Sequence, residues 1–231
     1  MENNQPNLPP VAIIVANYNG SKYVLDAIRS ALVQTYPACG IFITDDCSTD
    51  NSLSVITDFL MEGIGDLIVG QHQNLKADTE YNIDLYRTKR FPVYLFSLKK
   101  NVGRGLVRNF SIEYALNNGY YLVKILDSDD IMRERCVEIL TAEIIKDVER
   151  IGLSYSDYLI LNEKGIYRYE SKPPFDLSLL RSGNSHIHSG AMINSLALRE
   201  FGLYPNISTC EDFFLFRKIT FKQLVTCGFQ V

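Results

Sequence analysis

The chain has 231 residues, of which 46% are hydrophobic, and it carries a formal net charge of −4. This length and composition suit a single domain with a continuous core. The acidic balance and the scattered lysines and arginines argue against a surface that tracks phosphates, so we expect no nucleic-acid partner.

The cysteines and the N-terminal residues indicate in which cellular compartment the protein is expected. The five cysteines form no C-x-x-C pair, which favours neither a zinc knuckle nor a disulfide framework and fits a reducing, cytoplasmic location. Residues 1–10 lack a signal-peptide pattern and are expected to form a flexible leader. No apolar run approaches twenty residues, so no membrane span is predicted. Peripheral attachment at the inner face of a membrane stays open.

Strand and helix patterns alternate after the leader. Residues 11–16 form an apolar run typical of a strand buried on both faces, and Ser21 is expected to cap a helix that ends near residue 34. A second strand is expected at 41–44, and Thr49 or Asp50 is expected to begin the next helix. The further expected elements of this half are strands at 67–69, 93–98 and 120–126 and a helix at 103–118 that stops at Asn118-Gly119.

The remaining segments differ in character. Residues 70–92 are polar without a dominant period, and we interpret them as an insertion. In the second half, residues 158–161 and 166–169 predict an antiparallel hairpin. A helix at 132–149, a short strand at 191–193 and short helices at 196–201 and 212–221 complete the expectation.

Together these patterns predict an α/β fold. A Rossmann-like half with a mostly parallel sheet (11–130) is joined to a second half (131–231) that carries the small hairpin, and both belong to one domain from residue 11 to 231. Ligands of such sheets bind at the carboxyl ends of the strands.

The most informative stretch is Val-Lys-Ile-Leu-Asp-Ser-Asp-Asp at 123–130, an apolar run that ends in three acids. Clustered carboxylates repel one another unless a cation neutralises them. In an extended backbone Asp127 and Asp129 would point the same way and face one divalent ion, which could then hold a diphosphate. The alternative is that residues 128–130 only cap the following helix.

Four segments in order resemble a known family: VAIIVANYNG (11–20), IFITDDCSTD (41–50), NVGRGLVRN with LDSDD (101–109 and 126–130), and residues 190–219 with their Glu-Asp pair. They are similar to the inverting nucleotide-sugar glycosyltransferases of family 2, which have the A-type glycosyltransferase (GT-A) fold. The resemblance implies a nucleotide-sugar donor with UDP as the expected nucleotide, Mn²⁺ or Mg²⁺ as cofactor, and a saccharide, lipid-linked or protein acceptor. Such a reaction would serve cell-envelope polysaccharide, glycolipid or glycoprotein assembly.

The resemblance also implies a nucleotide pocket. Ala16 and Tyr18 would line it, with the Tyr18 ring against the base, and Asp45 or Asp46 would accept a hydrogen bond from uracil or ribose. Arg108 would contact the nucleotide or the acids. The structural alternatives are a turn aromatic for Tyr18, local loop and helix capping for Asp45 and Asp46, and a helix-surface salt bridge for Arg108.

The resemblance assigns the metal and the base as well. Asp129 is the expected direct metal ligand, with Asp127 nearer the ribose or a metal-bound water and Ser128 beside the nucleotide. Asp212 is the expected general base, because inversion by single displacement needs one carboxylate to take the acceptor proton. Glu211 would position Asp212 or the acceptor. The alternative for Asp212 is helix capping.

Several features leave room for other interpretations. His186 and His188 flank Ile187 and would share a face, which allows a metal or phosphate site, although a structural role is favoured. The insertion could shape acceptor binding or a subunit contact, so a homo-oligomer stays open. The competing functions are a non-catalytic nucleotide-sugar-binding module and a sugar nucleotidyltransferase, and residues 17–22 lack the glycine-rich loop of the latter.

Overall fold

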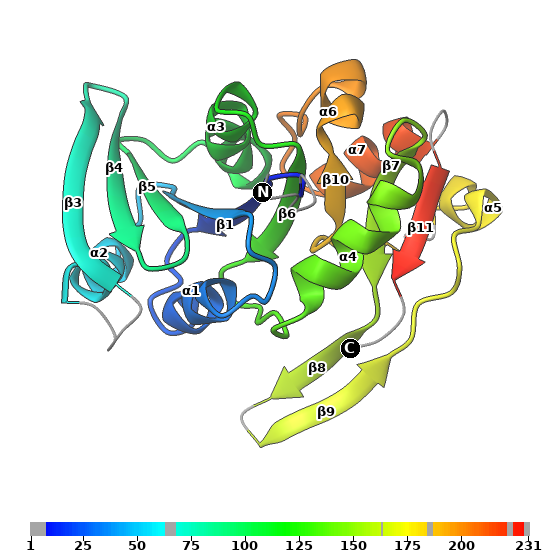
Figure 1. The fold of residues 1–231 in the computed structure, drawn as a ribbon, viewed down its shortest axis with the longest axis horizontal. Coiled ribbons are helices and arrows are strands. Elements are labelled where there is room, and N and C mark those ends of the chain that lie inside the picture. The colour runs from blue at the N-terminus through cyan, green and yellow to red at the C-terminus, as the bar shows by residue number, and fades with distance from the viewer. Residues whose placement is uncertain (1–7, 63–67, 163, 184–186, 221–223, 229–231) are drawn as a thin grey trace, which may run out of the picture.

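A mixed nine-stranded sheet organises the molecule, with strand order β11-β7-β10-β6-β1-β2-β5-β4-β3 (Figure 1). The computed structural model describes residues 8–62, 68–162, 164–183, 187–220 and 224–228. A separate two-stranded sheet, β8-β9, projects from the body of the molecule. Strands and helices alternate through the first half, which confirms the α/β fold that the sequence predicts.

The centre of the sheet is parallel, as expected. Strand β1 (Val11–Asn17) pairs in parallel with β2 (Cys39–Asp45) and β6 (Leu122–Asp127), and β2 pairs in parallel with β5 (Pro92–Leu98). These strands are rich in Val, Ile and Leu and are covered on both faces, which is why their sequences read as continuous apolar runs. All four end at the same edge of the sheet.

Two layers of helices bury the two faces. One face carries α1 (Val24–Leu32), α2 (Ser52–Glu62) and α4 (Cys136–Ile144), and the other carries α3 (Arg104–Asn117), α6 (Ser195–Phe201) and α7 (Glu211–Thr220). The alternation of β1 divides its side chains between the layers: Ile13 packs with the first group and Ile14 with the second. The core therefore has two layers, one on each face of the sheet.

Residues 70–92 extend the sheet. Strands β3 (Ile68–Ala77) and β4 (Tyr81–Thr88) form an antiparallel hairpin whose second strand pairs with β5. Its outer strand is largely exposed where its side chains are described. This explains the lack of an apolar period in the sequence, because an edge strand needs little burial.

The second half adds strands of both directions. Strand β10 (Met192–Asn194) is antiparallel to both β6 and β7 (Ile151–Ser156), and β11 (Leu224–Gly228) pairs in parallel with β7. The predicted hairpin is confirmed as β8 (Tyr158–Asn162) and β9 (Gly165–Glu170).

Two local expectations are wrong, and three elements were not expected. Ser21 does not cap α1, since Tyr23 precedes that helix without a side-chain cap and the backbone N–H of Val24 bonds to the Gly20 carbonyl. The helix expected at 132–149 begins only at Cys136 and gives way to a 3₁₀ turn, Ile145–Asp147. Strands β7 and β11 and the short helix α5 (Leu177–Arg181) were not expected from the sequence pattern.

Some expectations fall outside the described residues: most of the leader (1–7), Leu67, His186 and Phe221. The longest described helix, α3, has 14 residues, and no helix in the described part combines the length and apolarity needed to cross a bilayer.

One close contact in the core can be tested. A Cβ on Gly40 would lie 2.2 Å from the Tyr120 hydroxyl and 2.6 Å from its Cζ, and that ring is wedged edge-on against Phe42. Gly40→Ala should therefore lower the free energy of unfolding by about 1–3 kcal/mol, measured by urea denaturation. In a Tyr120→Ala background the added methyl should cost much less. An equal cost in both backgrounds would contradict the contact.

Candidate functional site

The carboxyl edge of the parallel strands gathers the predicted donor-side residues. Asn17 pairs in register with Asp45, and Ala16 pairs with Asp127 on the other side of β1. The ends of β1, β2 and β6 therefore lie next to one another, as the topology rule predicts.

The loops after β1 and β2 are tied together by side chains. The Nδ2 of Asn17 donates to Asp45 Oδ1 at 2.8 Å. Asn19 has a left-handed backbone (φ 52°), and its Oδ1 accepts from the backbone N–H of Thr49 at 2.8 Å and of Asp50 at 3.2 Å. Asn and Asp tolerate this conformation better than other residues with a side chain. The Asn17-Tyr18-Asn19-Gly20 turn is thus fixed against the second loop.

Asp45 and Asp46 hold this loop region together. Asp45 accepts from the hydroxyl of Ser48 at 2.6 Å and from its backbone N–H at 2.9 Å. Asp46 accepts from the backbone N–H groups of Val102 at 2.7 Å and Gly103 at 2.9 Å, which fixes the loop before α3. These contacts are the local loop contacts that the structural alternative for Asp45 and Asp46 expects. A contact of either acid with the nucleotide stays a prediction.

Tyr18 and Ser128 lie at the same edge. The Tyr18 ring is 51% exposed at the end of β1, where it is accessible to a ligand. Ser128 is half-buried directly after β6. Their nucleotide-binding roles stay predictions.

The acid cluster adopts a turn rather than an extended strand. Strand β6 ends at Asp127, and the backbone N–H of Asp130 donates to the Asp127 carbonyl at 3.0 Å. The expectation that strand alternation places Asp127 and Asp129 on one side is therefore wrong. The capping alternative is also wrong, because α4 begins only at Cys136.

Two side chains donate hydrogen bonds to Asp127. Its Oδ1 accepts from Arg108 Nη2 at 2.6 Å, and its Oδ2 accepts from the Ser189 hydroxyl at 2.7 Å. Burial opposes ionisation of this carboxyl, but the charges of Arg108 and Lys124 and the Ser189 hydrogen bond lower its pKa below the ordinary value. Asp127 is therefore ionised at neutral pH.

Lys124 and Ser189 are site residues that the sequence reasoning missed. The buried ammonium of Lys124 donates to the carbonyls of Ile125, at 2.8 Å, and Gly190. It places a positive charge behind the acid cluster. The signal for Lys124 was a single lysine inside an otherwise apolar strand, whereas Ser189 carried no comparable signal.

Arg108 connects the acid cluster to the C-terminal acids. Besides Asp127 it binds Glu211, with 2.7 Å between its Nη1 and Glu211 Oε1. The Arg108 side chain is only 4% exposed. The surface-salt-bridge alternative is therefore wrong, and contact with the acids is confirmed.

The Glu-Asp pair begins α7. Cys210 has a left-handed backbone (φ 60°), and its carbonyl accepts from the N–H of Phe214, which starts the helix. Glu211 is buried and paired with Arg108. Asp212 is half-buried, and its Oδ1 accepts from the backbone N–H of Phe213 at 2.7 Å. That bond satisfies one N–H of the first turn of α7, so the capping alternative is met in part. Asp212 Oδ2 has no hydrogen bond among the described residues.

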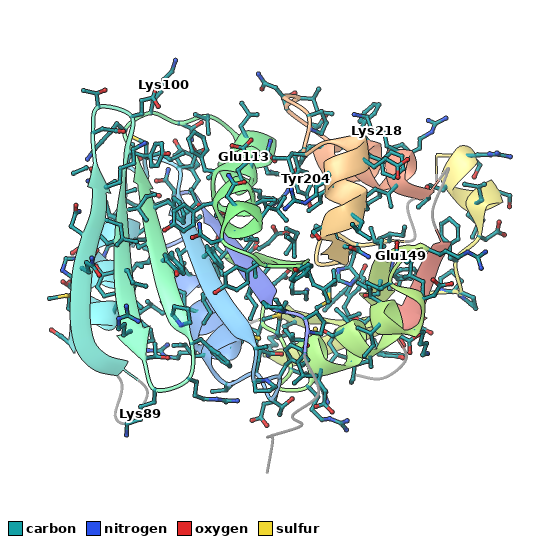
Figure 2. The ribbon with its side chains drawn as sticks, turned by 45° about the horizontal axis from the view of Figure 1, so that its top comes forward. Lys89, Lys100, Glu113, Glu149, Tyr204 and Lys218 are labelled. Carbon is teal, nitrogen blue, oxygen red and sulfur yellow. The ribbon has the colours of Figure 1, made fainter. Side chains whose placement is uncertain are left out.

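Tyr204 and Asn109 support this arrangement. Asn109 donates to the Tyr204 carbonyl at 2.9 Å and accepts from its N–H at 3.1 Å. The Tyr204 ring lies 5.2 Å from the Arg108 guanidinium carbon, between α3 and the C-terminal helices (Figure 2). Asn109 ends the NVGRGLVRN segment of the family resemblance, but no sequence pattern indicated its contact with Tyr204, which spans 95 positions.

His188 is half-buried and in a structural position. Its Nδ1 accepts from the backbone N–H of Gly190 at 3.0 Å. Burial, with the nearby charges of Lys124 and Lys172, lowers its pKa to about 3, so the ring is neutral. This agrees with the structural role favoured for it.

The donors for a divalent cation are few. Among the described residues, no three His, Cys, Asp or Glu side chains are grouped as a metal site. Both oxygens of Asp127 are engaged, whereas Asp129 is exposed and makes no side-chain hydrogen bond within the described part. One or two carboxylates completed by phosphate oxygens suit Mg²⁺ or Mn²⁺, so this chemistry fits a cation that arrives with a diphosphate.

Known proteins share this fold. S. aureus TarS superposes with a TM-score of 0.66 at 17% identity, covering 94% of this chain and 57% of TarS; TarS structures include complexes with UDP and UDP-GlcNAc. The mannosyltransferase PcManGT from Pyrobaculum calidifontis, in complex with GDP-Man and Mn²⁺, superposes with a TM-score of 0.60 at 15% identity, covering 97% of this chain and 57% of that protein. At these identities the likeness concerns the fold.

Sequence comparison is more specific. The glycosyltransferase GlyG of Streptococcus pneumoniae is 28% identical over 149 residues, which are 64% of this chain and 40% of GlyG. The chain thus spans well under two thirds of the length of this relative. The model of the family "Glycosyl transferase family 2" matches residues 12–201, which include the donor-side strands, the acid cluster and α6. The chain belongs to glycosyltransferase family 2.

Proposed function

We propose that the protein transfers a sugar from a nucleotide diphosphate sugar, with UDP as the nucleotide, to an acceptor hydroxyl with inversion at the anomeric carbon. The observation that carries the proposal is the position of Arg108, which joins the acid after β6 to the acid that begins α7. The donor-side edge and the Glu-Asp pair therefore belong to one site. The UDP complexes of the structural neighbour TarS support the choice of nucleotide.

Asp212 is the proposed base. It would accept the proton of the acceptor hydroxyl while that oxygen bonds to the anomeric carbon and the nucleoside diphosphate leaves with its bonding electron pair. Its Oδ2, which has no hydrogen bond within the described ranges, suits this task, since the other oxygen is held by the backbone of α7. Glu211, bound to Arg108, would fix the start of the helix.

Asp129 is the proposed ligand of Mn²⁺ or Mg²⁺, with Asp127 near the ribose or a water of the ion. The bound cation would stabilise the negative charge of the leaving diphosphate. Tyr18, Ala16 and Ser128 would line the nucleotide site at the ends of β1 and β6. The Mn²⁺ complex of PcManGT supports the choice of ion.

The acceptor and compartment are part of the proposal. A saccharide, lipid-linked or protein hydroxyl would be the acceptor, in the cytoplasm or at the inner face of the membrane. Screening nucleotide diphosphate sugars by thermal shift would identify the donor, because a ligand of the folded state raises the melting temperature.

The assignment of the base predicts a separation of binding from turnover. Asp212→Asn should leave the affinity for UDP with Mn²⁺ essentially unchanged, because the Asp212 side chain bonds to its own helix and not to the acid cluster. UDP release from the donor in the presence of a panel of oligosaccharide acceptors should fall by about 10²–10⁴-fold.

Two comparisons control this experiment. Glu113→Gln, an exposed change on α3, should affect neither quantity, and Asp129→Ala should weaken UDP binding. An equal loss of UDP affinity in Asp212→Asn would contradict its role as base. UDP binding by the wild type without any turnover would favour the non-catalytic module.

The crowded acids predict a pH effect on stability. Neighbouring protein atoms partly remove the Asp130 carboxylate from water, and the charges of Asp127 and Asp129 repel it. Both effects raise the pKa of Asp130, from 3.8 to about 6. The folded state therefore holds this proton more tightly than the unfolded chain, and stability should fall as the pH rises from about 4 to 6. Asp130→Asn should stabilise the metal-free protein at pH 7 by about 1 kcal/mol, after allowance for solvent screening.

Urea denaturation at pH 4 and pH 7 in EDTA measures this effect. The advantage of Asp130→Asn should largely vanish at pH 4, where the wild-type carboxyl is protonated. Asp58→Asn, an exposed acid on α2, serves as the control and should give a small difference that does not change with pH. A pH-independent effect of Asp130→Asn would show that charge repulsion is not its cause.

A further inference from the structure

The guanidinium of Arg108 is shared by acids from distant parts of the chain. It reaches Asp127 at the end of β6 and Glu211 at the start of α7, with separations of 2.6 and 2.7 Å. The side chains of Arg108 and Glu211 are each 4% exposed, and that of Asp127 is 25% exposed. Because these groups are largely removed from water, the effective dielectric is low and each carboxylate interacts strongly with the cation between them.

Each terminal nitrogen of the Arg108 guanidinium binds one acid. Nη2 binds Asp127 and Nη1 binds Glu211, while the buried Nε has no hydrogen-bond partner among the described residues. The group is planar and rigid. A shift at the Asp127 end therefore displaces the nitrogen that holds Glu211.

The surroundings leave Arg108 little other freedom. A Cβ on Gly105, one turn earlier in α3, would lie 2.8 Å from the Pro205 carbonyl oxygen and 3.4 Å from the Glu211 Cβ and Cγ, so the missing side chain lets α3 approach α7 closely. The Tyr204 ring packs against the guanidinium, and Asn109 fixes the Tyr204 backbone. The start of α7 is thus located by its contact with α3, and Arg108 links it to the end of β6.

We propose that Arg108 is a positioning residue that transmits occupation of the nucleotide side of the site to helix α7, which carries Asp212. The inference rests on the proposed function, because it takes the donor to bind beside Asp127 and Asp212 to be the base. A donor bound there gives the Asp127 carboxylate new partners, which changes its hold on Arg108. The rigid guanidinium passes that change to Glu211, so donor binding orders the helix of the base before the acceptor reacts.

Hydrogen exchange of the α7 amides, Glu211–Thr220, tests this coupling. UDP with Mn²⁺ should slow exchange in α7 of the wild type by about fivefold or more, the lower end of ordinary coupling between sites. In Arg108→Lys the compact ammonium cannot bind two acids in the same fork geometry. This variant should still bind UDP, but the UDP-induced protection of α7 should be lost.

Matched variants separate a loss of coupling between the nucleotide site and α7 from a general loss of stability. Arg90→Lys changes an arginine that donates to the Gln34 carbonyl, away from the acids, and should keep the UDP-induced protection. If Arg108→Lys fails to give a cooperative thermal transition, Glu211→Gln replaces it. Glu211→Gln keeps an oxygen for Arg108 but removes the charge, and the same loss of protection is expected.

The outcomes distinguish this inference from the function on which it rests. The variants could change α7 exchange by the same factor with and without UDP, so that UDP still slows it. Arg108 would then be only structural, and the inference would be overturned. Loss of UDP binding in Arg108→Lys would overturn it as well, because Arg108 would then be a nucleotide ligand. UDP binding to the wild type with unchanged α7 exchange refutes the inference alone. No UDP binding to the wild type refutes the proposed donor and the inference with it.

Discussion

The buried cation of Arg108 lies between two carboxylates that would otherwise repel each other, and the geometry of the site depends on this arrangement. The cost of removing three charges from water offsets much of their attraction, so such a group is a weak source of stability. Its contribution here is to fix positions. Gly105 and Tyr204 support that interpretation, because Gly105 lets α3 approach α7 closely and the Tyr204 ring packs against the guanidinium.

The donor-side loops follow a different principle, since they are fixed by local hydrogen bonds rather than by buried charge. Asp45 ties its own loop to Asn17, and Asp46 ties that loop to the start of α3. An ionised carboxylate offers about four lone-pair sites, so one that holds two backbone N–H groups can still accept from a ligand. The loop-holding contacts of Asp46 and its predicted contact with a nucleotide are therefore compatible.

The sequence predicted what local pattern encodes. The strands at 11–16 and 93–98 and the helix at 103–118 were predicted because buried runs and an Asn-Gly stop are local signals, and the topology rule then placed their ends together. Local pattern could not predict β3, the outer strand of the β3–β4 hairpin, because an exposed edge strand lacks an apolar period. It also could not reveal Ser189 or Tyr204, whose contacts with Asp127 and Asn109 join segments 62 and 95 positions apart.

The two acids that begin α7 show how neighbouring residues acquire different environments. Successive helical residues point about 100° apart, so Glu211 turns into the buried contact with Arg108 while Asp212 turns toward the less buried side. A proton acceptor needs an uncommitted carboxylate oxygen, whereas a structural acid needs a permanent partner. Placing both on one rigid first turn meets these opposite needs, because the pairing of Glu211 fixes the backbone from which Asp212 projects. The Glu-Asp pair is therefore best understood as one anchored acid that orients one free acid.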